Sequence, residues 1–142
     1  MQRRSIVARV WMTFCVAAVV GVTAGCDRAS PTEPEGPTLA DVQAQVFTPN
    51  CASSGCHAGT DAREGLDLTA GSAFENTVDV PSSQVPGIMR VEPGEPSDSY
   101  LFIKITGGDR MASGTFKMPI GVDLMDDQID LVEEWILGGA ER

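Results

Sequence analysis

Residues 50–57, with the sequence NCASSGCH, hold the side chains whose types and spacing could do chemistry. Cys51 and Cys56 provide two thiols, and His57 directly follows the second. In c-type haem attachment, two cysteine sulfurs add to the two vinyl groups of the porphyrin, and the adjacent histidine becomes an axial ligand of the iron. The usual motif has two residues between the cysteines, whereas this segment has four small ones that can loop out at low steric cost. The pattern therefore predicts covalent binding of one haem.

The same three side chains allow two other uses. A disulfide between Cys51 and Cys56 would close a short loop, as is common in exported proteins. A zinc ion could bind both thiols, the imidazole and one carboxylate, although the directly adjacent Cys and His and the lack of a second cysteine pair disfavour this. The chain has one histidine, so a site built on two or three imidazoles is excluded.

The first 25 residues have the pattern of a secretory signal. Arg3, Arg4 and Arg9 precede an apolar run that ends in small residues before Cys26. That run is shorter than the roughly 20 residues that span a bilayer as a permanent helix. We therefore predict a signal peptide over residues 1–25.

Cys26 follows a tripeptide, Thr-Ala-Gly, that resembles the lipobox of bacterial lipoproteins. This resemblance implies that Cys26 is acylated and becomes the mature N-terminus. Thr23 stands where the lipobox usually has Leu, which leaves plain secretion as the alternative. Residues 26–37 are rich in proline and contain no large apolar side chain, so we predict an extended tether between the lipid anchor and a domain over residues 38–142.

The net negative charge of the chain limits the kinds of molecule that it can bind. Removal of residues 1–25 takes away three arginines and leaves 7 basic and 20 acidic residues, a net charge of −13. Such a surface repels phosphate backbones, which excludes nucleic-acid binding, and it favours a protein partner with a basic face. The chain shows no pattern of a catalytic nucleophile, an acid-base pair or a phosphate-binding loop, so we predict that it is not an enzyme.

Helical signals dominate the predicted domain, which we therefore assign to the all-α class. Thr38 and Asp41 predict the start of a helix, and Pro49 predicts its end. Residues 100–105 also allow a strand, because they are rich in β-branched side chains. Further helices are predicted within residues 70–78, from a cap at Ser97 or Asp98 to Gly107, and from Asp126 to Gly138.

Residues from about 42 to 140 resemble a class I c-type cytochrome domain, in particular the planctomycete-type cytochrome c-like modules of secreted bacterial proteins. The parts that carry this resemblance are residues 47–57, residues 91–96 followed by 99–101, the sequence Lys-Met-Pro at 117–119, and residues 135–136 with 139–140. The four-residue gap between the cysteines departs from the pattern of the family.

The resemblance implies a small helical domain with long irregular loops wrapped around a covalent haem c. Cys51 and Cys56 would attach the porphyrin, and His57 would be the proximal iron ligand. Met118, just before a proline in the late loop, would be the distal ligand, and the first and last helices would cross beside the haem. The other methionines that could take the distal place are Met89, Met111 and Met125.

These observations predict a lipid-anchored, monohaem c-type cytochrome at the periplasmic or outer face of the cell membrane. It would carry single electrons between redox partner proteins, because an iron with both axial positions filled disfavours oxygen activation. An open sixth position that binds a gas is a further possibility. The alternative from a different class is a non-redox lipoprotein module, closed by a Cys51 to Cys56 disulfide, that binds a protein or an envelope component.

Overall fold

The computed structural model describes residues 36–142. The predicted signal peptide, the lipidation of Cys26 and nearly all of the tether over residues 26–37 lie outside the described residues. Within the described part of the chain, no helix is both long enough and apolar enough to cross a membrane.

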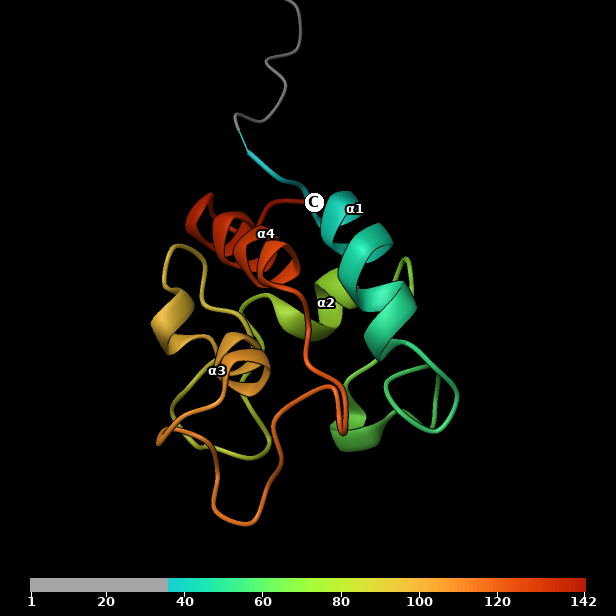
Figure 1. The fold of residues 1–142 in the computed structure, drawn as a ribbon, viewed down its shortest axis with the longest axis vertical. Helices are drawn as coiled ribbons and strands as arrows, with labels where there is room; N and C mark the ends of the chain where they lie inside the picture. The colour runs from blue at the N-terminus through green and yellow to red at the C-terminus, as the bar shows by residue number, and fades with distance from the viewer. Residues whose placement is uncertain (1–35) are drawn as a thin grey trace, which may run out of the picture. The chain divides into compact units, whose positions relative to one another are not determined.

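Short helices joined by long irregular segments make up the fold (Figure 1). Over residues 36–142 the structure contains no strand, only three isolated bridges between residues 78 and 99, so the predicted all-α class is confirmed. The elements are α1 (Leu39–Val42), the π-helix η1 (Gln43–Cys51), the 3-10 helix η2 (Arg63–Gly65), α2 (Ala73–Thr77), the 3-10 helix η3 (Pro96–Asp98), α3 (Tyr100–Thr106) and α4 (Asp126–Leu137).

The first helix begins where Thr38 and Asp41 predict. The Asp41 carboxylate accepts hydrogen bonds from the backbone amide of Thr38 at 2.9 Å and from its hydroxyl at 2.7 Å. These bonds hold the pKa of Asp41 below its ordinary value, because they favour the charged carboxylate. The chain therefore enters α1 with its first turn held by side chains.

Pro49 does not end the first helix, so this prediction is wrong. The helix continues from α1 into η1, which extends to Cys51 and contains Pro49. The amide of Ala52 donates to the carbonyl of Phe47 at 2.7 Å, a bond that spans five residues. In an α-helix the proline ring would clash with the carbonyl four residues back, and the wider π-turn avoids that clash. As a result, Cys51 is placed at the end of a helix and not in a loop.

The helix α4 is the best predicted element and forms the centre of the core. Trp135 is fully buried, and its ring meets that of Phe47 edge-on, with 6.4 Å between the ring centroids and 88° between the planes. The Gln128 amide donates to the Gln45 carbonyl at 2.7 Å. The predicted contact between the first and last helices is therefore confirmed, and Figure 1 shows α1 and α4 side by side.

Residues 100–105 form the helix α3 and not a strand. Its N-cap is Ser99, whereas Ser97 or Asp98 was predicted, because Ser97 and Asp98 already belong to the preceding turn, η3. The Ser99 hydroxyl instead accepts from the Glu92 amide at 2.8 Å, which ties the start of α3 to the proline-rich segment before it. The predicted helix within residues 70–78 is also found, as α2.

Candidate functional site

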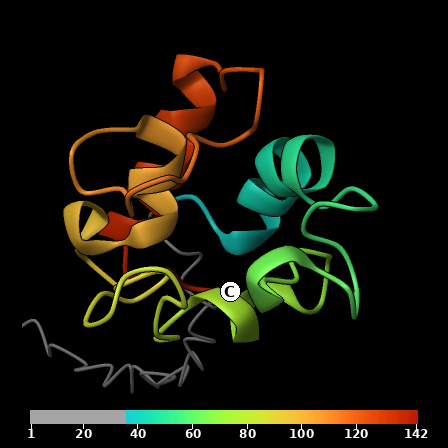
Figure 2. The same cartoon turned by 90° about the horizontal axis from the view of Figure 1, so that it is seen from below.

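A cavity of about 490 Å³ lies between the segment after η1 and the helix α3. Figures 1 and 2 show these two parts of the chain on opposite sides of the domain. The volume falls within the roughly 300–1,000 Å³ range of pockets that hold a cofactor or another small molecule. Its apolar wall is formed by Val46, Phe47, Leu66, Leu68, Leu101 and Ile105.

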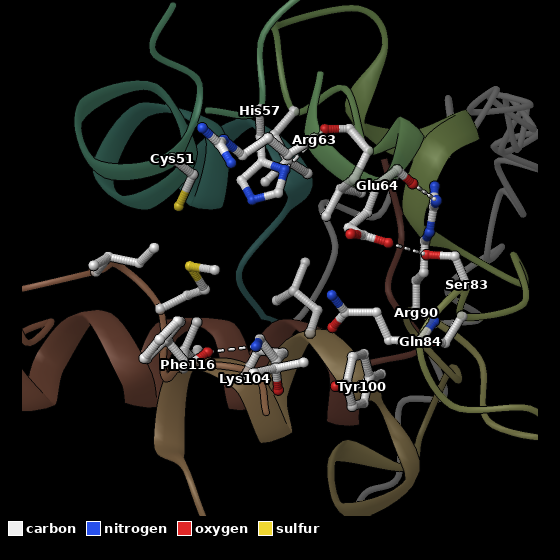
Figure 3. Close-up of a pocket in the computed structure, with 18 of the residues that line it drawn as sticks. Cys51, His57, Arg63, Glu64, Ser83, Gln84, Arg90, Tyr100, Lys104 and Phe116 are labelled. Carbon is white, nitrogen blue, oxygen red and sulfur yellow. Dashed lines mark hydrogen bonds between the residues drawn. The ribbon is translucent and has the colours of Figure 1, made fainter. Parts of the chain in front are cut away.

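The cavity collects three of the four predicted haem residues. Cys51 and His57 project into it from one wall, opposite Lys104 and Phe116 (Figure 3). Met118 also lines the cavity, and its backbone amide donates to the Lys104 carbonyl at 2.7 Å, so its main chain is attached to the opposite wall. Residues 61 positions apart in the chain thus contribute an imidazole and a thioether to one cavity.

The imidazole of His57 is held through one ring nitrogen. Its Nδ1 lies 3.2 Å from the Leu66 carbonyl, and since a carbonyl only accepts, Nδ1 is the protonated nitrogen. The lone pair is therefore on Nε2. Burial lowers the pKa of His57, against the opposing effect of the hydrogen bond to Leu66, so the ring is neutral at pH 7. A neutral imidazole oriented in this way is suited to bind a metal ion.

Cys51 presents a protonated thiol. Its Sγ lies 3.8 Å from the Val46 carbonyl, one turn back in η1. Burial, and to a lesser degree the nearby Cys56, raises the pKa of Cys51 to about 11. Because zinc binds the thiolate, Cys51 in this state is a poor zinc ligand.

Cys56 does not line the cavity, in contrast to the prediction that both cysteines share one site. It is exposed, in the turn between η1 and His57, and both it and Cys51 are free thiols. Arg63 holds this turn, because its amide donates to the Cys56 carbonyl and its Nε to the Gly55 carbonyl, both at 2.8 Å. The four small residues of the turn carry Cys56 away from the cavity and return the chain at His57.

The other methionines lie outside this cavity. Met89 lines a separate polar hollow beside η3, and Met125 is 61% exposed at the start of α4. Met111 is half-buried in the loop after α3 but is not part of the cavity wall. Of the four candidates for a distal ligand, Met118 is thus the one that the fold brings to the cavity with His57.

The basic side chains of this site are not among the residues that the sequence predicted. Arg63, Arg90 and Lys104 all line the cavity. Lys104 is buried, and its Nζ donates to the Phe116 carbonyl. Burial lowers the pKa of Lys104. The helical period could have shown Lys104, which shares one face of α3 with Tyr100 and Leu101, whereas nothing in the local sequence marks Arg90.

The donors for a zinc site do not come together. Among residues 36–142, no group of three or more His, Cys, Asp and Glu side chains is placed to hold a metal ion. The arrangement instead combines a neutral imidazole, a thioether and a protonated thiol in one apolar cavity. Comparisons of the chain with protein-family models, with curated proteins and with solved structures found no match.

Proposed function

We propose that this protein is a monohaem c-type cytochrome that carries single electrons. The observation that carries the proposal is the cavity that His57 and Met118 line from two different parts of the fold, with Cys51 beside them. Imidazole and thioether are the axial pair of electron-transfer haem iron.

The residues of the cavity fit a porphyrin in chemistry and in size. The apolar wall would cover the ring faces, and the volume suits a cofactor-sized ligand. Ser83, Gln84 and Arg90 lie together at one end of the cavity, as Figure 3 shows, and their polar side chains and positive charge suit the carboxylates of the porphyrin. When bound, the haem supplies an iron that changes between the ferric and ferrous states.

The side chains of the protein would set the reduction potential of the iron. The bond from His57 Nδ1 to the Leu66 carbonyl fixes the tautomer and increases the basicity of Nε2. Met118, as a soft thioether, favours the ferrous state and a comparatively high potential. With both axial positions filled by the protein, oxygen has no site on the iron, so the domain would be a carrier and not a catalyst.

Covalent attachment would involve both thiols. Cys51 lies in the cavity wall, whereas Cys56 has to be supplied by the small-residue turn that ends at His57. A vinyl group would accept the sulfur of each thiol, with its proton going to the neighbouring vinyl carbon. The proposal therefore includes a movement of the Cys56 side chain toward the porphyrin during attachment.

The cellular setting is also part of the proposal and is supported by the sequence. The signal pattern of residues 1–25 and the lipobox-like tripeptide before Cys26 favour export and a lipid anchor at the cell membrane. Residues 26–37 would then tether the domain within reach of membrane partners. The charge of −13 favours redox partner proteins with a basic face.

The test is expression of the chain together with a machinery for c-haem attachment. We expect haem that stays with the protein through acid-acetone extraction, sharp visible bands on reduction, and an intact mass that includes both haem and acyl chains. The Cys51→Ala, Cys56→Ala double variant is the control and should lose the haem on extraction. A colourless protein with a Cys51 to Cys56 disulfide would instead support the non-redox binding module. A change of the reduced spectrum on addition of CO would show an open sixth position.

A further inference from the structure

Arg90 lines the cavity. The three hydrogen bonds that its guanidinium donates all go to backbone carbonyls. Nη1 donates to the Asn76 carbonyl at 2.8 Å and to the Gly65 carbonyl at 3.2 Å, and Nη2 donates to the Glu64 carbonyl at 2.7 Å. Two of these acceptors are consecutive residues of η2, and the third, Asn76, lies in the last turn of α2. Arg90 therefore connects three segments that are far apart in the sequence.

The two acceptors in η2 have unusual backbone geometry. Glu64 has φ of 58° and Gly65 has φ of 59°, so two successive residues are left-handed. A residue other than glycine keeps this conformation only where its surroundings hold it there. Glu64 is exposed, and its carboxylate contact is with the Ser83 hydroxyl at 3.1 Å. The two hydrogen bonds from the Arg90 guanidinium to the Glu64 and Gly65 carbonyls therefore help to hold these two residues in the left-handed conformation.

The next residue along the chain is Leu66, whose carbonyl accepts the hydrogen bond from His57 Nδ1 at 3.2 Å. Leu66 directly follows the left-handed pair, so the position of its backbone depends on how Glu64 and Gly65 are held. A short path of backbone bonds therefore runs from the Arg90 guanidinium to the ring of His57. Figure 3 shows Arg90 beside Glu64 and His57 further along the same wall of the cavity.

We propose that Arg90 is a positioning residue for His57. It acts through the segment from Glu64 to Leu66 and sets the direction of the carbonyl that fixes the imidazole. The inference rests on the proposed function, in which His57 is the proximal ligand, and it adds the residue that sets the orientation of that ligand. Lysine could not take this role, since a single ammonium lacks the planar fork that reaches carbonyls of two segments at once.

The matched control is Arg110. It carries the same charge as Arg90, but it lies outside the cavity, and its side chain donates to Ser97 and Asp98 and not to the segment that ends at Leu66. Arg110→Gln therefore removes a positive charge and leaves the contacts of Arg90 and His57. Arg90→Lys does the opposite, because it keeps the charge and removes the fork.

The experiment measures exchange of the His57 Nδ1 proton with water by ¹⁵N-edited NMR of the full chain, with the haem ferrous and also without haem. We expect exchange to be about tenfold faster in both Arg90→Gln and Arg90→Lys, as for the loss of a charge-assisted hydrogen bond. Arg110→Gln should stay within about twofold of the wild type. Unchanged exchange in Arg90→Gln, or full rescue by Arg90→Lys, would overturn the inference.

Two further observations keep the test decisive. If the Arg90 variants do not fold, the same exchange is measured in the wild type at increasing denaturant concentration. The exchange rates of the Arg90 Nη protons and of the His57 Nδ1 proton should then rise together. Different dependences on denaturant would refute the proposal that Arg90 positions His57. Failure of the haem proposal itself would be seen as a colourless wild type. The comparison without haem still tests the role of Arg90, and it also excludes an effect that comes from direct contact of Arg90 with the cofactor.

Discussion

At the scale of single residues, the two cysteines lie in different environments, and so do Met118 and the other methionines. The sequence around each residue does not reveal this difference. Cys51 is held in the cavity wall with a raised pKa, and Cys56 is exposed in the turn that follows. Met118 shares the cavity with His57, and Met111 does not. These differences in position lead to different expected reactivities.

Alkylation should separate the two cysteines. With the pKa of Cys51 at about 11, roughly one in a thousand Cys51 side chains is a thiolate at pH 8. Cys56 is exposed, so we expect iodoacetamide to modify it at least about tenfold faster in the haem-free chain. Peptide mass spectrometry would give both rates, and in guanidinium chloride the two rates should converge. Equal rates in the folded chain would contradict the structure.

If the domain binds haem as proposed, substitution of Met118 should change the iron site, and substitution of Met111 should not. We expect Met118→Ala to remove the thioether-to-iron absorption band of the ferric protein and to lower its potential by on the order of 0.1 V, since a thioether favours ferrous iron. Met111→Ala is the matched control from the same loop. If the band disappears in Met111→Ala instead, the assignment of the distal ligand is wrong.

At the scale of elements, the first and last helices hold the domain together and the short elements between them shape the cavity. The buried contact of Phe47 with Trp135 joins η1 to α4. The Trp135 indole also donates to the Glu141 carbonyl at 2.7 Å, which attaches the C-terminal residues to the core. The stability of the wall that holds Cys51 therefore depends on α4.

Truncation of Trp135 should unfold the domain far more readily than truncation of its exposed neighbour. We expect Trp135→Ala to reduce the free energy of unfolding by about 3–5 kcal/mol, because it leaves a large cavity in the core. Leu137→Ala, on the same helix but 58% exposed, should cost less than about 0.5 kcal/mol. Urea unfolding followed by circular dichroism measures both, and similar losses would show that α4 is not packed as described.

The start of α1 should show a dependence on pH. Thr38→Ala should reduce the free energy of unfolding near neutral pH, because it removes the hydroxyl that donates to the Asp41 carboxylate. The hydrogen bonds from Thr38 lower the pKa of the Asp41 carboxylate in the folded protein. The stabilisation from the Thr38 hydroxyl is therefore fully present above the ordinary pKa of 3.8, and it is lost as the pH falls through the lower folded pKa. Urea unfolding of the two proteins between pH 7 and pH 2 tests this, and a difference that is independent of pH would argue against it.

At the scale of the whole molecule, a strongly acidic chain contains a cavity with basic side chains in its wall. The net charge is −10 for the full sequence, yet Arg63, Arg90 and Lys104 all lie at the site. At 0.1 M salt, interactions between exposed charges more than about 10 Å apart are largely screened, so the net charge steers approach mainly at low salt, and at contact the local charges matter more. Partner choice is therefore expected to follow the acidic surface.

The rate of electron transfer should depend on salt with a sign set by the partner's charge. For the mature protein, we expect oxidation by a cationic cobalt complex to slow by about tenfold between about 10 mM and 0.5 M salt, because the attraction is screened. Oxidation by anionic ferricyanide should become faster over the same range. Stopped-flow absorbance measures both, and rates that are independent of salt would refute a role for the net charge in docking.

The sequence by itself determined the elements whose signals are local. The cap at Thr38, the amphipathic pattern from Asp126 to Leu137 and the glycines that end the helices depend on neighbours within one or two turns. The cluster of Cys51, Cys56 and His57 was visible for the same reason. Even here, the continuation of the helix past Pro49 was missed, because it depends on a change of hydrogen-bond spacing that has no clear sequence signal.

Only the tertiary structure decided which of these residues share a site. Cys51 and Cys56 are equivalent in the sequence, but the turn between them places one in the cavity and the other in solvent. The presence of Met118 in the cavity with His57, and the three carbonyls that Arg90 binds, depend on contacts between segments that are remote in the chain. Such contacts arise from how the helices and loops pack together, and packing is a property of the whole fold that no local pattern of residues encodes.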